Sequence, residues 1–206
     1  MTDPQIRLFV VLELPTSVRT ALGEIASRLR PTAGSNVRWT DPNGIHLTLK
    51  FIGEVPAAQL EPVRGALAAV RDAQPIEAVF RGLGWFPSAR RPRVFWAGVE
   101  AGVELAALAA RIESALEPLG IPRESREFHP HLTLARIKSD ERLQELKREA
   151  ERLGTPEFGR ATYTELDLMQ STLKPQGAIY TRIERFPFAA GAAAGHGQVA
   201  REGALT

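Results

Sequence analysis

The sequence contains no cysteine. Disulfide bonds, thiolate nucleophiles and cysteine-based zinc sites are therefore excluded by composition alone. It also lacks an apolar run of about 18 or more residues, the length that a membrane-spanning helix requires. The first apolar stretch, residues 6–14, is short and carries Arg7 and Glu13. These absences predict a soluble protein without a membrane span or targeting segment, and the lack of cysteine fits the reducing cytoplasm.

Neither sign of charge is in large excess. The 206 residues carry a formal net charge of +2, with 24% charged and 44% hydrophobic residues, which is an ordinary globular composition. The sequence pI of about 9.3 leaves room for a local basic patch. The net charge does not by itself indicate a nucleic-acid binder. Length and composition predict a domain that folds alone, and we expect a monomer.

Apolar periodicity predicts both strands and helices, so the expected fold class is α+β. Strands are expected at residues 6–14, 36–40, 44–53, 76–86, 94–99, 132–137, 162–173 and 178–186. Helices are expected from Thr16 or Ser17 to Pro31, over residues 57–71, along the stripe at residues 105–116, and from Ser139 or Asp140 to about Leu153. In the first and last of these helices, the hydroxyl or carboxylate residue is expected to be the N-cap. The second half of the chain repeats the pattern of the first.

The C-terminal segment differs from the rest of the chain. Residues 189–206 are rich in Ala and Gly and show no periodic apolar face. Such a segment cannot bury enough apolar surface to offset the entropy lost on ordering. We therefore expect one domain over residues 1–188 and a disordered tail over residues 189–206. His196 lies in that tail and is a poor candidate for catalysis.

One tetrapeptide occurs twice. His-Leu-Thr-Leu stands at residues 46–49 and again at residues 131–134, one copy in each half of the chain. In a strand, side chains two positions apart share a face, so each copy presents a histidine and a threonine together and turns its leucines into a core. Repetition makes the motif far more specific than one copy alone. The pairs His46 with Thr48 and His131 with Thr133 are the candidate site.

Two other interpretations of the motif remain open. The strands can be ordinary amphipathic strands whose solvated face happens to carry His and Thr. Alternatively, His129 and His131 have a spacing that occurs in zinc and iron sites. However, no carboxylate or third histidine is obvious near His46, and Pro130 restricts the backbone at His129. We expect neither a metal nor a cofactor.

Two histidines suit displacement at phosphorus. One group must take a proton from water while another, on the far side, gives a proton to the leaving oxygen. Two imidazoles with pKa values near 6.5 can divide this work near neutral pH. Hydroxyls of Thr48 and Thr133 can donate hydrogen bonds to the phosphoryl oxygens, and Arg136 is near enough in sequence to add positive charge. In an ideal strand, however, Arg136 faces away from His131 unless the strand bends or ends.

These residues resemble a known family. The two tetrapeptides, with residues 50–55 after the first and Ala135-Arg136 after the second, are similar to the motifs of the two-histidine (2H) phosphoesterases. Within that family the resemblance is to RNA 2′,3′-cyclic phosphodiesterases, first described as 2′-5′ RNA ligases. The stretches at residues 7–10, 37–39, 93–99 and 171–180 share it, so it covers about residues 7–186.

The resemblance implies a bilobal, pseudo-symmetric duplication in which two antiparallel sheets face each other across a central cleft, with helices outside. It implies that His46 is the proton donor, that His131 is the proton acceptor, and that Thr48 and Thr133 hold the phosphate. The implied reaction opens the 2′,3′-cyclic phosphate at an RNA end to a 2′-phosphomonoester, with weak reversible 2′-5′ ligation as the same chemistry run backwards. Alternatives are a phosphodiesterase of a small cyclic nucleotide and a module that binds an RNA end without turnover.

Several nearby residues are less specific. Trp39, Phe51 and Phe128 flank the motifs and can stack on a base, although aromatic residues in strands more often belong to a core. Three arginines at positions 90, 91 and 93 can follow a phosphate backbone, although arginines in a loop are commonly just solvated.

Overall fold

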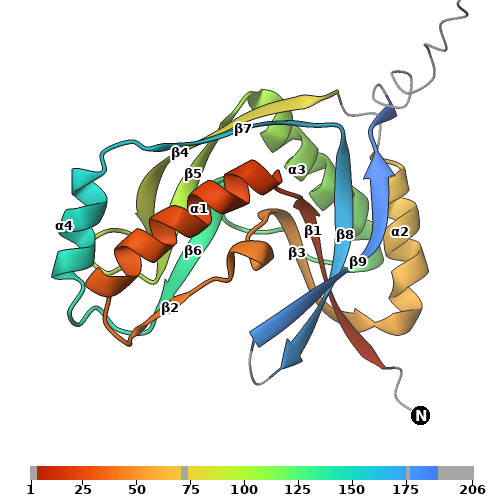
Figure 1. Cartoon of the computed structure of the whole chain (residues 1–206). Helices are drawn as coiled ribbons and strands as arrows, with labels where there is room; N and C mark the ends of the chain where they lie inside the picture. Colours follow the sequence, from red (N-terminus) through yellow and green to blue (C-terminus); the bar gives the residue numbers. More distant parts are fainter. Residues whose placement is uncertain (1–3, 71–73, 175–176, 190–206) are drawn as a thin grey trace, which may run out of the picture.

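The computed structural model describes residues 4–70, 74–174 and 177–189. It confirms an α+β fold with two antiparallel sheets (Figure 1). In the first sheet the strand order is β3 (Leu47–Pro56), β1 (Gln5–Leu12), β8 (Glu165–Lys174) and β9 (Gly177–Pro187). In the second sheet the order is β2 (Val37–Trp39), β6 (His131–Ile137), β5 (Val94–Ala101), β4 (Ile76–Phe86) and β7 (Glu157–Tyr163).

Four α-helices in the described ranges pack on the two sheets (Figure 1): α1 (Thr16–Leu29), α2 (Leu60–Ala68), α3 (Val103–Leu116) and α4 (Gln144–Arg152). Helix α1 follows a strand of the first sheet but contacts β7 and α4 in the second half of the molecule. Helix α3 follows a strand of the second sheet but contacts β3 and α2. The two halves therefore exchange helices, which joins both sheets to one main hydrophobic core.

The repeated tetrapeptides are oriented as their pattern predicts. Their four leucines are at most 4% exposed and belong to the main core: Leu47, Leu49, Leu132 and Leu134. Each buried leucine contributes about 1.5–3 kcal/mol relative to an exposed one. A slip of one residue would turn all of them toward solvent, so their burial fixes the register of both strands. The histidines and threonines consequently face away from the core.

Two strand predictions were incomplete. The expected strand at residues 162–173 is divided at Thr164, where the chain leaves the second sheet as β7 and enters the first as β8. In addition, β2 and β3 belong to different sheets, although only the single turn η2 (Pro42–Gly44) and a few residues separate them in sequence. Periodicity reports which residues are buried but not which partner strand buries them.

The two predicted helix caps are wrong. Pro15 occupies the N-cap of α1, and no side chain caps it. Helix α4 begins only at Gln144. The amide of Asn36 donates to the carbonyls of Ser139 and Glu141 at 2.6 and 2.8 Å, which holds this segment outside the helix.

Some expectations fall beyond the described residues. The predicted end of the second helix at Arg71 and the predicted tail from residue 190 onward lie outside them. Within the described ranges, no helix is long and apolar enough to cross a membrane.

Candidate active site

The two strands that carry the tetrapeptides contact each other. Strand β3 is an edge strand of the first sheet and β6 is an inner strand of the second, and the two sheets approach one another through this pair. His131 is the first residue of β6, whereas His46 lies directly before β3 and not within it. The fold thus brings together two segments that stand in opposite halves of the sequence.

Both motif strands contain an irregularity at the same place. In the pairing of β3 with β1, Thr48 lies opposite Val11 but Lys50 lies opposite Val10. As a result Leu49 and Lys50 are both buried, at 4% and 5% exposed. The following residue, Phe51, turns outward and is 59% exposed. This is the arrangement of a β-bulge, in which one extra residue resets the alternation of faces.

Strand β6 repeats the irregularity. Thr133 lies opposite Trp96 and Ala135 lies opposite Phe95, so Leu134 and Ala135 are both buried. The next residue, Arg136, is exposed. Without the shift, alternation would place Arg136 on the core face. The irregularity returns it to the face of His131 and Thr133, and its guanidinium is close enough to lower the pKa of His131.

Each histidine ring is held by a carbonyl two residues before it. Nδ1 of His131 donates to the carbonyl of His129 at 2.8 Å. His46 makes the corresponding hydrogen bond to the backbone of Gly44. When Nδ1 carries a proton and donates it to a carbonyl, Nε2 is left as the nitrogen that can exchange a proton with a ligand. The two rings are therefore oriented in the same way by local backbone.

Aromatic side chains contact both rings. Tyr180 meets His46 edge-on, with ring centroids 5.2 Å apart, and Phe86 meets His131 edge-on at 4.9 Å. Phe9 lies against His46 at 5.0 Å and also contacts Tyr180 and Phe51. These contacts restrict ring rotation and remove water from the imidazoles. Phe9 and Tyr180 stand in stretches that share the resemblance, but sequence reasoning assigned none of Phe9, Phe86 and Tyr180 to the site, because each comes from a different strand.

Burial lowers the pKa of both histidines. Desolvation of His46 lowers its pKa to about 4, although the Gly44 backbone and the Glu13 carboxylate act in the opposite direction. Desolvation also lowers the pKa of His131, and the charges of Arg136 and His129 add to the effect. Both imidazoles are consequently neutral at pH 7 in the free protein. An anionic ligand between them would raise both pKa values again.

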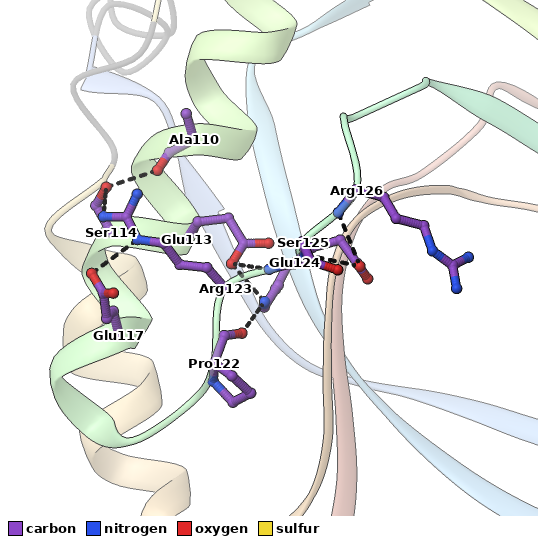
Figure 2. A network of polar contacts seen from close by, with 10 residues as sticks. Ala110, Glu113, Ser114, Glu117, Pro122, Arg123, Glu124, Ser125 and Arg126 are labelled. Carbon is purple, nitrogen blue, oxygen red and sulfur yellow. Dashed lines mark hydrogen bonds and ion pairs between the residues drawn. The ribbon is translucent and has the colours of Figure 1, made fainter.

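A buried lysine links the two motif regions. The ammonium of Lys50 donates to Glu113 of α3 and to the carbonyl of Pro122, each at 2.6 Å. Figure 2 shows Glu113 facing the segment of Pro122 to Arg126, and the amide of Glu124 also donates to Glu113 at 3.3 Å. This segment leads directly to His131. The strand of the first motif is thus hydrogen-bonded to the loop that precedes the second motif.

The aromatic and arginine residues near the motifs have different environments in the structure. Trp39 and Phe128 pack against the main core, whereas Phe51 is exposed. Arg93 donates to the carbonyl of Lys138 at 2.8 Å. Among the described residues, no group of three or more His, Cys, Asp or Glu is arranged to hold a metal ion.

Comparison with known proteins finds a family whose model spans most of the chain. The family described as LigT like Phosphoesterase matches residues 12–96 and 99–180. A protein of Thermus thermophilus named RNA 2′,3′-cyclic phosphodiesterase is 38% identical over 191 residues, covering 88% of this chain and 89% of its own length. An Aquifex aeolicus protein of the same name is 35% identical over 173 residues, covering 81% of this chain and 90% of its own.

Solved structures have a similar fold. A crystal structure of a Thermus thermophilus protein superposes with a TM-score of 0.73 at 34% identity, covering 88% of this chain and 97% of that one. Escherichia coli LigT complexed with 3′-AMP also superposes with a TM-score of 0.73, at 27% identity, covering 90% of this chain and 99% of its own.

Proposed function

The chain belongs to the LigT-like phosphoesterases, the two-histidine (2H) family, and from this premise we propose that it hydrolyses RNA 2′,3′-cyclic phosphodiester ends to 2′-phosphomonoesters. The observation that carries the proposal is the matched pair of motif strands. Two His-x-Thr segments stand at the beginning of two contacting strands, and each imidazole is oriented by a backbone group two residues before it.

Each residue has a distinct role in the proposed reaction. His131 takes a proton from water as the water oxygen bonds to phosphorus. His46 gives a proton to the 3′ oxygen as its bond to phosphorus breaks. The two steps leave a 2′-phosphomonoester and a free 3′ hydroxyl, and the proton gained by His131 is returned through solvent. The histidines thus provide the two proton transfers that this displacement needs.

Charge on the phosphoryl oxygens is stabilised by three side chains. Thr48 and Thr133 stand beside the histidines on the same faces and offer hydroxyl donors. Arg136, which the irregularity in β6 turns to the face of His131, offers charge-assisted hydrogen bonds. Donors aimed at oxygens that gain charge in the transition state contribute most when the site excludes water. The burial of both imidazoles indicates such a site.

The two halves of the site differ in a way that supports the assigned roles. The half containing His46 has an aromatic surface beside the ring, in which Phe9 contacts both Phe51 and Tyr180. An aromatic surface suits a nucleoside, because every base has a face on which a ring can stack. The leaving oxygen belongs to the nucleoside, so its proton comes from the histidine on that side. His46 is therefore assigned as the acid.

The relatives support a nucleotide substrate. The Thermus and Aquifex proteins carry the name RNA 2′,3′-cyclic phosphodiesterase, and the Escherichia coli relative was solved with 3′-AMP. Because the reaction is reversible in principle, the same site would catalyse weak 2′-5′ ligation. The chemistry assigned to the histidines requires no metal or cofactor.

The deciding experiment compares substrates and products. Purified protein is incubated with 2′,3′-cyclic mononucleotides and with RNA that ends in a cyclic phosphate, in the presence of EDTA. We expect turnover of the RNA, and phosphorus NMR should show only the 2′-phosphate. Turnover of cyclic mononucleotides alone would favour the small-nucleotide alternative, and binding without turnover would favour the binding module. A 3′-phosphate product would contradict the assigned orientation.

A further inference from the structure

The first sheet presents two rows of cross-strand neighbours on the same face as the first motif. One row begins at Thr48 on β3 and continues through Val11 and Asp167 to Arg185 on β9. Residues directly opposite each other on paired strands share a face of the sheet. Arg185 therefore lies on the face of Thr48, although 137 positions separate them in sequence.

The second row runs beside the first. It begins at Phe51 and continues through Phe9 and Met169 to Arg182 on β9. Phe9 and Met169, together with Val11, form a small buried cluster separate from the main core. Each row thus starts in the strand of the first motif and ends at an arginine of β9. The two arginines are partly exposed, with side-chain exposures of 41% for Arg182 and 48% for Arg185.

A buried carboxylate joins the ends of the rows. Asp167 is 2% exposed, and its Oδ1 lies 3.0 Å from Nε of Arg182 and 3.6 Å from Nε of Arg185. Burial raises the pKa of Asp167, while the two arginines act to lower it. Glu165 lies 3.1 Å from Nε of Arg185. Oδ1 of Asp167 has no hydrogen-bond partner among the described residues, so the buried carboxylate is held against the two arginines by charge.

The arginines retain donors for another partner. A guanidinium carries five N–H donors, and the contacts with the carboxylates are made through Nε. The terminal nitrogens of an arginine form the fork that binds phosphate oxygens. Two such forks, held by Asp167 at the border of the catalytic face, have the chemistry of a site for a phosphodiester.

The location of the pair suits one part of an RNA. Neighbouring strands lie about 4.8 Å apart, so Asp167 is about 10 Å from Thr48 across the sheet. A strand that ends in a 2′,3′-cyclic phosphate can continue only from its 5′ oxygen. If the terminal nucleoside lies on the aromatic side of the site, the next phosphate lies farther along this same face.

We propose that Arg182 and Arg185, held by Asp167, bind the phosphodiester on the 5′ side of the terminal nucleotide and thereby favour RNA ends over cyclic mononucleotides. The inference rests on the proposed function and names its substrate class. The pair acts on binding and not on the proton transfers, because each arginine lies at the end of its row opposite to the strand of the first motif.

The test compares two substrates that differ only in the extra nucleotide and its phosphate. Wild type, Arg182→Ala and Arg185→Ala are assayed with a 2′,3′-cyclic mononucleotide that lacks a 5′ phosphate and with a dinucleotide ending in the same cyclic phosphate. Each substitution should lower kcat/KM for the dinucleotide on the order of tenfold, the size expected for a charged hydrogen bond. The mononucleotide should be affected less than about twofold. The dependence of binding on salt should weaken by about one ion per arginine removed.

Controls separate binding from folding. Arg152→Ala removes an exposed arginine of α4 that pairs with Glu149. This substitution should leave kcat/KM unchanged for both substrates. Asp167→Asn should selectively lower kcat/KM for the dinucleotide. Circular dichroism reports whether this variant keeps the fold. Equal losses on both substrates, or no loss on either, would overturn the inference.

A catalysis-independent readout separates this inference from the proposed function. The dissociation constants of the 2′-phosphate products are measured by fluorescence anisotropy for the same variants. If wild type hydrolyses neither substrate, the proposed function fails. If it hydrolyses both but the variants bind the dinucleotide product as tightly as wild type does, only the assignment of the arginines fails.

Discussion

Phe51 and Arg136 occupy the same position in two matching strands, each five residues after a histidine and directly after an irregularity that turns it outward. The two halves of the site are alike in histidine, threonine and leucine and differ here. One half offers an exposed ring and the other a positive charge. A site built by duplication is symmetric by default, and a substrate with a nucleoside at one end and a phosphate at the other needs such a difference.

The first prediction tests the two histidines. His46→Ala and His131→Ala should each lower kcat about 100-fold or more, because each removes a proton-transfer group. His129→Ala is the matched control. Its carbonyl, which holds His131, remains, while its exposed imidazole is lost. Near-normal turnover of either active-site variant, measured under single-turnover conditions, would rule out the two-histidine mechanism.

The second prediction concerns the phosphate. Thr48→Ala and Thr133→Ala should each reduce kcat on the order of 10-fold, since other donors remain. Arg136→Ala should reduce it further, and Arg136→Lys should recover only part, because lysine lacks the fork geometry. Arg38 lies opposite Arg136 on β2, so Arg38→Ala controls for loss of charge on the same strand pair. Unchanged kinetics for all three site variants would remove their phosphate-binding role.

The third prediction concerns stability. Lys50→Met keeps the apolar stem but leaves Glu113 without its buried partner, and the side chains of this pair are only 4% and 15% exposed. Breaking a buried pair typically costs about 3–5 kcal/mol. Urea denaturation should therefore show a large loss in the free energy of unfolding. Lys50→Met combined with Glu113→Gln should be less destabilised than the single variant, and an equal or greater loss would show that the ion pair is not the cause.

The sequence predicts the parts of this fold that depend on local pattern. The alternation in the tetrapeptides indicated which side chains are buried, and β4 was predicted with the bounds that it has. Sheet membership could not be predicted, because the division at Thr164 depends on which strand each segment pairs with. The placement of Arg136 depends on an irregularity that no sequence pattern marks. Tyr180 reaches His46 only because β9 joins the first sheet.

The burial of the two histidines is another feature that could not be predicted from the sequence. From the sequence alone we expected ordinary histidine pKa values and an activity optimum near neutrality, since nothing local indicates that the rings are buried. Their burial comes from Phe9, Tyr180 and Phe86, which arrive from β1, β9 and β4. The expected optimum must therefore be revised toward lower pH.

The last prediction follows from this revision. The profile of kcat/KM against pH reports the free enzyme and free substrate. The reaction needs one imidazole protonated and the other neutral, so the profile is bell-shaped and belongs to the coupled pair. Both pKa values are lowered from 6.5, that of His46 to about 4. The singly protonated pair therefore peaks below pH 6.5, and its fraction falls about tenfold for each pH unit above both pKa values.

The kcat profile should lie at higher pH than the kcat/KM profile, because the bound anionic phosphate raises both pKa values. Glu13→Gln removes a charge that raises the pKa of His46, so it should move the profile of the coupled pair to still lower pH. Glu13 has no corresponding effect on the pKa of His131, so an unmoved profile would show that the charge of Glu13 does not act on His46. A maximum of kcat/KM at or above pH 7 would mean that water reaches the imidazoles in the free enzyme and that the aromatic shell does not desolvate them.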